Sequence, residues 1–302
     1  MKPIIDMSKE YGLVFDGGGA RGAYQIGAWK ALVEAGVRIN AVAGTSVGAL
    51  NGALVCMGDV DKAEDIWSKM TFSTVMDVDD EWMERLFHKQ TTIKEFLNEG
   101  WKKMKDGGID ITPLRNLIHE VIDEDAIRKS GKEFCLLTFS LSDFRELDLS
   151  VEDIPEGLLE DFLLASAYLI GFKNERLHGK KYIDGGVINN VPLSSLVGRG
   201  YENVIEIRIY GPGREPRVKM PENGVKYEIT PRVKLGSIIE FSGKRSRQNL
   251  RIGYFDAKRM LYGLEGFIYY LEQTHEDEYY EELLRGIRAV SYTHLRAHET
   301  LS

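Results

Sequence analysis

The first sixty residues alternate short apolar runs with helical patterns, separated by glycines. The run Leu13–Phe15 ends in three glycines, which is typical of a buried parallel strand. Tyr24–Ala35 has apolar residues at helical spacing, and Gly36 follows it as a helix terminator. Ile39–Ala43 predicts a second strand, and a glycine-flanked turn leads from it into another helical run that reaches Met57. This alternation predicts a three-layer α/β/α fold with a mostly parallel central sheet.

The next segment, residues 58–125, holds 17 acidic residues against nine Lys and Arg, and we expect it to form an inserted helical cap. Its aromatic residues either line an apolar trough or form the core of the cap. They are Trp67, Phe72, Trp82, Phe87, Phe96 and Trp101. Further strands are expected at 134–139, 146–151 and 204–209, and a further helix at 156–169.

The domain is expected to span residues 1–290. Residues 291–302 continue no pattern and resemble a non-native read-through tail, so they are left out of the fold prediction. His294 and His298 then lie outside any site.

The charge balance narrows the range of partners. The 302 residues include 39 Lys and Arg against 47 Asp and Glu, a net charge of −8. We therefore expect no nucleic acid as the main partner, because phosphate backbones require clustered cations.

The two cysteines, Cys56 and Cys135, sit in apolar surroundings, which argues against a disulfide framework or a cysteine zinc site. No apolar run approaches the roughly 20 residues that span a bilayer, and Met1–Tyr11 lacks the apolar core of a signal peptide. A cytoplasmic enzyme is expected.

The first motif with chemical meaning is Gly44-Thr45-Ser46-Val47-Gly48, a G-x-S-x-G sequence between the second strand and its helix. A nucleophilic serine needs a sharp turn with small neighbours, and the N–H groups of the following helix stabilise negative charge at the same point. The alternative is a purely structural turn.

A glycine-rich loop, Asp16-Gly17-Gly18-Gly19-Ala20-Arg21-Gly22, follows the first strand. Its exposed backbone N–H groups suit an anion, either a phosphate or a developing oxyanion. The loop also matches G-x-G-x-x-G, but a dinucleotide fold needs an acidic residue where Ala43–Ser46 stands. A P-loop is excluded because no Gly-Lys-Ser/Thr follows the glycines.

The third motif is Asp184-Gly185-Gly186, which taken alone predicts an ordinary hairpin turn. The three motifs together, in this order, resemble the patatin-like phospholipase family over roughly residues 11–210. The flanks extend the resemblance: the third motif continues through Val187-Ile188-Asn189-Asn190-Val191-Pro192, and Ala165-Ser166-Ala167 precedes it.

The resemblance implies a serine–aspartate dyad, with Ser46 as nucleophile and Asp184 as the base that accepts its proton. Partial burial should raise the pKa of that carboxyl from about 3.9. The implied oxyanion hole is formed by the glycine loop and the elbow, namely Gly17, Gly18, Gly19 and Val47. Supporting roles fall to Gly44, Gly48, Gly185, Gly186 and Arg21, the last either stabilising the loop or contacting substrate.

An ordinary serine hydrolase uses a histidine base instead. The candidates are His88, His119, His178 and His275, and none stands in a catalytic setting; His178 is expected in a surface loop. No metal site is expected, because the acidic residues at 77–80 lack the spacing of a calcium loop, and no cofactor is expected.

The implied substrates are fatty-acyl esters of phospholipids, lysophospholipids or neutral lipids, cleaved through an acyl-serine intermediate. The alternative is a catalytically silent protein that uses the same fold to bind a lipid or a partner. Residues 214–259 carry twelve Lys and Arg against five acidic residues. They form either an ordinary solvated surface or a peripheral contact with an anionic, inner membrane surface.

Overall fold

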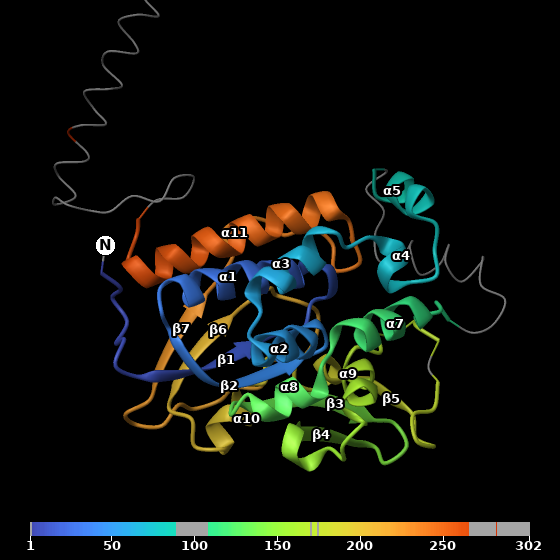
Figure 1. The fold of residues 1–302 in the computed structure, drawn as a ribbon, viewed down its shortest axis with the longest axis horizontal. Coiled ribbons are helices and arrows are strands. Elements are labelled where there is room, and N and C mark those ends of the chain that lie inside the picture. Colours follow the sequence, from blue (N-terminus) through green and yellow to red (C-terminus); the bar gives the residue numbers. More distant parts are fainter. Residues whose placement is uncertain (1, 89–107, 170, 174, 266–281, 283–302) are drawn as a thin grey trace, which may run out of the picture.

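The computed structural model describes residues 2–88, 108–169, 171–173, 175–265 and 282 (Figure 1). Its centre is a seven-stranded sheet. The strands are β1 (Glu10–Phe15), β2 (Arg38–Thr45), β3 (Glu133–Ser140), β4 (Arg145–Ser150), β5 (Tyr182–Asp184), β6 (Asn203–Ile207) and β7 (Val225–Ile229).

The strand order is β4-β3-β2-β1-β6-β7, and β5 pairs with β3. The pairs β3–β2, β2–β1, β1–β6 and β6–β7 are parallel, whereas β4 and β5 run antiparallel to β3. The prediction of a mostly parallel sheet is confirmed.

Helices and 3₁₀ turns connect the strands. They are η1 (Gly19–Gly22), α1 (Ala23–Glu34), α2 (Val47–Met57), α3 (Val60–Ser68), α4 (Phe72–Val75), α5 (Asp80–His88), α7 (Thr112–Val121), α8 (Glu124–Lys129), η2 (Val151–Asp153), α9 (Leu159–Ser166), η3 (Gly185–Val187), α10 (Leu193–Gly198) and α11 (Gly243–Tyr262).

The side-chain alternation of the strands divides the core between the two faces of the sheet. Leu13 and Phe15 belong to the larger core, which includes the apolar faces of α1, α2, α3, α9 and α11. Val14, between them, packs in a smaller core with Leu193 and Leu196 of α10. Helices therefore cover both faces, as predicted, but unequally.

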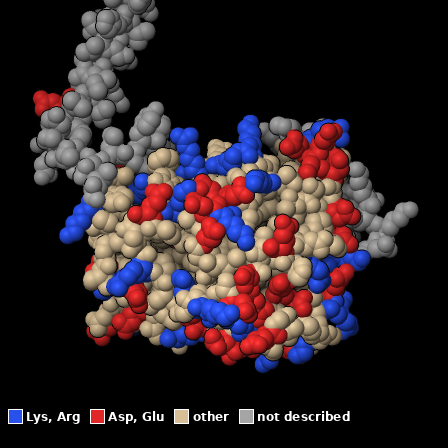
Figure 2. Space-filling model, viewed as in Figure 1, with Lys and Arg blue, Asp and Glu red and all other residues tan. Residues whose placement is uncertain are grey.

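α11 lies along α1 and α3 (Figure 1). The crossing is close enough to require glycines: a Cβ at Gly27 would lie 1.9 Å from the Leu250 carbonyl oxygen, and one at Gly253 would lie 1.9 Å from that of Tyr24. Acidic and basic side chains intermingle over the visible surface of these helices (Figure 2).

Most expected elements lie within one to three residues of their predicted bounds. The expected strand at 204–209 is β6, which ends at Ile207. Glu206 of β6 is 2% exposed and forms a salt bridge with Lys226 of β7, so this charged position of the strand is buried. Within 58–125, the described residues form α3, α4, α5, α7 and the start of α8, whereas 89–107, with Phe96 and Trp101, lie outside the described residues. That this segment is a separate cap stays a prediction.

Candidate active site

Ser46 occupies a strand-to-helix elbow. β2 ends at Thr45, α2 begins at Val47, and Ser46 between them has φ 56° and ψ −128°, a conformation that non-glycine residues rarely adopt. The flanking glycines permit the close packing: a Cβ at Gly44 would lie 2.2 Å from the Gly48 carbonyl oxygen, and one at Gly48 would lie 2.4 Å from that of Phe15. The predicted elbow is therefore present.

The sheet explains why Asp184 comes close to Ser46. Along one edge of β3, Leu137 is paired with Thr45 of β2, and the next residue, Thr138, is paired with Asp184 of β5. β2 and β5 therefore lie one after the other beside β3, run in opposite directions, and meet at their C-terminal ends. Ser46 and Asp184 consequently line the same cleft.

Asp184 is buried, with 5% of the residue exposed. Burial raises its pKa to about 6, although hydrogen bonds from the Ser46 hydroxyl and the Gly186 N–H oppose that shift. The Gly186 bond is 2.8 Å long. Gly185 packs against β3, where a Cβ would lie 2.6 Å from the Leu137 carbonyl oxygen. The third motif is therefore a strand end followed by a 3₁₀ turn, and not a hairpin.

The glycine loop forms another wall of this cleft, where Gly17, Gly18 and Gly19 line it beside Ser46. The Gly17 N–H donates to the Asn190 carbonyl at 3.2 Å, so this N–H is already engaged. Gly19 has φ 53°, and a Cβ there would lie 2.1 Å from the Ile238 carbonyl oxygen. Val47 is the first residue of α2, a position whose N–H has no partner within a helix.

Arg21 holds the loop to neighbouring segments. Its guanidinium donates to the carbonyl oxygens of Tyr210 (2.6 Å), Gly236 (2.9 Å) and Ile209 (3.2 Å). These bonds favour the structural alternative for Arg21 over substrate contact.

Asp16 anchors the beginning of the loop. Its carboxylate is fully buried, accepts the backbone N–H groups of Ile209 (2.8 Å) and Tyr210 (3.0 Å), and lies 3.3 Å from Arg208 Nε. Burial raises its pKa to about 7, against the opposing effects of Arg208 and the two N–H groups. Asp16 thereby ties the end of β1 to the segment that follows β6.

Two supporting residues were not assigned roles from the sequence. Ser166, at the end of α9, accepts the Ser46 N–H at 2.9 Å and donates to the Leu137 carbonyl at 2.6 Å. Asn190 donates to the carbonyl oxygens of Gly17 (3.3 Å) and Gly211 (3.2 Å). Both lie in segments that carried the family resemblance, but only the tertiary structure reveals these bonds.

Two of the histidines lie at the surface and pair with acids. His119 Nδ1 is 3.0 Å from Glu160, and His178 Nε2 is 2.7 Å from Asp161. The expectation of a surface position for His178 is confirmed, since its side chain is 52% exposed. The side chain of His88 and all of His275 lie outside the described residues.

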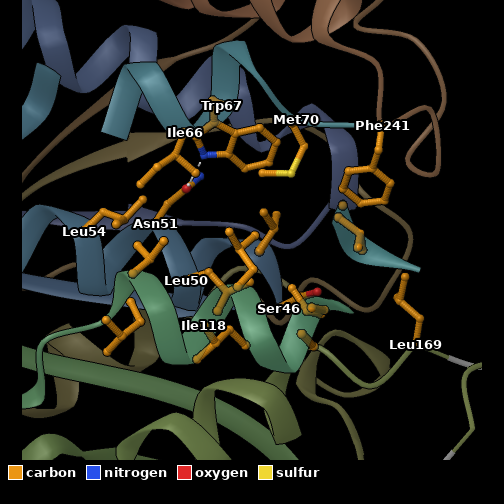
Figure 3. Close-up of a pocket in the computed structure, with 18 of the residues that line it drawn as sticks. Ser46, Leu50, Asn51, Leu54, Ile66, Trp67, Met70, Ile118, Leu169 and Phe241 are labelled. Carbon is orange, nitrogen blue, oxygen red and sulfur yellow. Dashed lines mark hydrogen bonds between the residues drawn. The ribbon is translucent and has the colours of Figure 1, made fainter. Parts of the chain in front are cut away.

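A second cavity adjoins the cleft at Ser46. This apolar pocket lies among α2, α3 and α7, as Figure 3 shows. The cleft and the apolar pocket share Gly19, Ser46, Leu169 and Phe172, whereas Asp184 and Gly186 line the cleft alone. Of the aromatic residues expected to line a trough, Trp67 lines the apolar pocket, whereas Phe72 and Phe87 stack on each other at 5.4 Å.

No described helix is long and apolar enough to cross a bilayer. The described part of the chain also contains no group of three or more His, Cys, Asp or Glu residues that could hold a metal ion. Cys56 and Cys135 are buried free thiols, and burial raises the pKa of each to about 12.

The chain is also similar in sequence to known proteins. The family model "Patatin-like phospholipase" matches residues 13–197. Neuropathy target esterase sws of Drosophila melanogaster is 29% identical over 208 residues, which are 66% of this chain and 13% of that protein. The Drosophila grimshawi protein of the same name is 31% identical over 191 residues, 60% of this chain and 11% of that protein. The chain thus spans about an eighth of the length of these relatives.

Two solved structures are also similar. VipD from Legionella pneumophila has a TM-score of 0.46 at 13% identity, covering 83% of this chain and 66% of that one. Human GIVD cytosolic phospholipase A2, in complex with methyl gamma-linolenyl fluorophosphonate, has a TM-score of 0.44 at 13% identity, covering 82% of this chain and 57% of that one.

Proposed function

Because the chain belongs to the patatin-like phospholipase family, we propose that it is a serine lipid acyl hydrolase, acting on carboxylic esters of phospholipids or lysophospholipids. The observation that carries the proposal is the meeting of β2 and β5 along β3, which brings Ser46 and Asp184 into one cleft.

In the proposed reaction, the Ser46 hydroxyl attacks the acyl carbonyl carbon while Asp184 accepts its proton. Negative charge on the carbonyl oxygen is stabilised by the N–H groups of Gly18, Gly19 and Val47; a donor of this kind is typically worth about 3–4 kcal/mol in the barrier. Asp184 then returns the proton to the departing alkoxide. In the second half, Asp184 activates a water molecule that hydrolyses the acyl-serine ester. Ser166 acts as a positioning residue, because it fixes the Ser46 N–H.

The experiment is labelling with a fluorophosphonate ester followed by intact mass spectrometry. The wild type and a Ser142→Ala control, altered in an exposed turn, should gain one phosphonyl group, whereas Ser46→Ala should gain none and should hydrolyse no ester. The free energy of unfolding of Ser46→Ala should lie within about 1 kcal/mol of that of the wild type, because the substitution removes only one hydroxyl. Absence of labelling in the folded wild type would support the alternative, a catalytically silent lipid- or partner-binding protein.

The proposed substrate also bears on where the protein acts. A lipid hydrolase meets its substrate at an interface, so a cytoplasmic protein with peripheral contact to an anionic membrane surface is the arrangement that we propose. No part of the proposed reaction requires a metal or a cofactor.

A further inference from the structure

We propose that the apolar pocket binds the acyl chain of the substrate and that Leu54 and Ile66, at its far end, set the preferred chain length near ten carbons. This inference rests on the proposed function, because it places the acyl chain of the ester in the apolar pocket on one side of Ser46 and the leaving group on the other side. The leaving group then occupies the cleft.

The position of Asp184 determines which cavity receives the leaving group and which receives the acyl chain. The leaving alkoxide must receive a proton from Asp184, so it has to lie where that carboxyl is accessible. Asp184 lines the cleft and does not line the apolar pocket. The acyl chain, on the other side of the carbonyl carbon, therefore extends into the apolar pocket.

The pocket presents a surface suited to a hydrocarbon chain. Its one amide side chain, Asn51, is engaged elsewhere: its Oδ1 accepts the Trp67 Nε1–H at 2.9 Å, and its Nδ2 donates to Gln25 at 2.8 Å and Gly22 at 3.0 Å. A chain entering from Ser46 thus meets no unpaired polar atom of Asn51. Burial of each methylene there is favourable by an amount that corresponds to roughly fourfold in binding.

The length follows from helix geometry. Ser46 directly precedes α2, and Leu50 and Leu54 line the pocket one and two turns further along that helix. Figure 3 shows Leu54 and Ile66 at the end of the pocket away from Ser46. The eight residues from Ser46 to Leu54 rise about 12 Å. An extended chain advances about 1.2 Å per bond, as estimated from the roughly 3.5 Å that an extended residue spans with three bonds, so about ten carbons reach Leu54.

The test is the ratio of kcat/KM for p-nitrophenyl esters of four to sixteen carbons, measured below their critical micelle concentrations. For the wild type, kcat/KM should rise by about twofold to fourfold per methylene and level off near ten carbons. Leu54→Ala should move the plateau toward fourteen carbons. Leu50→Trp, one turn nearer to Ser46, should move it below eight. Val55→Ala is the matched control, because it truncates the neighbouring buried residue, which does not line the pocket, and it should leave the profile of the wild type unchanged.

A binding measurement separates this inference from the catalytic proposal. In the Ser46→Ala background, decanoate with bromine on its last carbon should quench tryptophan fluorescence, and Trp67→Phe should remove most of that quenching. Quenching with no Ser46-dependent turnover would retain the pocket assignment and reject the hydrolase. The pocket assignment alone would be overturned if turnover depended on Ser46 but Leu54→Ala and Leu50→Trp kept the plateau of the wild type. It would also be overturned if turnover depended on Ser46 but Trp67 contributed nothing to the quenching.

Discussion

At the scale of single residues, the environment of Asp184 differs from that of the other acid near the glycine loop. Asp184 is buried beside a hydroxyl and one N–H, without a cationic partner among the causes that shift its pKa. Asp16 is equally buried but faces Arg208 and two N–H groups. An uncompensated carboxyl next to a serine hydroxyl is suited to accepting a proton, whereas Asp16 is suited to holding two segments together.

This difference predicts the pH dependence of activity. Because burial raises the pKa of Asp184 to about 6, kcat/KM should rise as the pH increases through 6 and then level off. His119→Gln and His178→Gln should each keep kcat within a few-fold and keep the same acidic limb, since both rings pair with surface acids. A loss of about a thousandfold in either variant would identify a histidine base and reject the dyad.

The same pKa predicts an effect on stability. The folded-state pKa lies above the ordinary value of 3.8, so Asp184 contributes stability that is present below about pH 4 and is lost as the pH rises through 6. Asp184→Asn should therefore be inactive, yet at pH 8 it should be more stable than the wild type, by at most about 3 kcal/mol. Denaturant unfolding of both proteins at pH 4 and pH 8 measures this. The difference in unfolding free energy, Asp184→Asn minus wild type, should be larger at pH 8 than at pH 4. A smaller difference at pH 8 would contradict the prediction.

At the scale of elements, the crossing of α1 and α11 depends on the absence of side chains. Gly253→Ala should cost several kcal/mol, because its Cβ would lie 1.9 Å from the Tyr24 carbonyl oxygen and the helices would have to separate. Gly198→Ala, in α10, is the matched control: a Cβ there meets nothing within 4 Å, and alanine favours helix by up to about 1 kcal/mol. Thermal melting compares the two. Equal melting temperatures would show that α11 tolerates displacement from α1.

The elements that the sequence predicts well are those with a strong local signal. β1, β2 and β3 are buried on both faces and consist mainly of consecutive apolar residues, so the amino-acid sequence of each segment predicts a buried strand. β5 has three residues, and β7 is half exposed, so neither carries such a signal. Motifs located Ser46 and Asp184, but their meeting depends on pairing with β3, a contact between distant segments.

At the scale of the whole molecule, charge is distributed unevenly over a protein of net charge −8. Lys244, Arg247 and Arg251 are exposed on α11 at spacings of three and four residues, so they share one face. Arg247 and Arg251 also border a surface hollow with the acidic residues Glu34, Asp61, Glu64 and Asp65. These acids oppose the attraction of the cations to an anionic surface, so we expect any membrane association through this face to be weak.

We therefore predict salt-sensitive partitioning onto phosphatidylglycerol vesicles. Each cation near such a surface is worth about 1 kcal/mol, and salt screens it within a Debye length of about 10 Å at 0.1 M. Changing Lys244, Arg247 and Arg251 to Ser should reduce sedimentation with vesicles at low salt by tenfold or more. Arg245 stays in place, because it pairs with Glu240 at 3.2 Å and its loss would disturb the start of α11. Phosphatidylcholine vesicles and the melting temperature serve as controls. If the wild type and the variant partition equally at low and high salt, or if neither binds, the basic face of α11 is ordinary solvated surface.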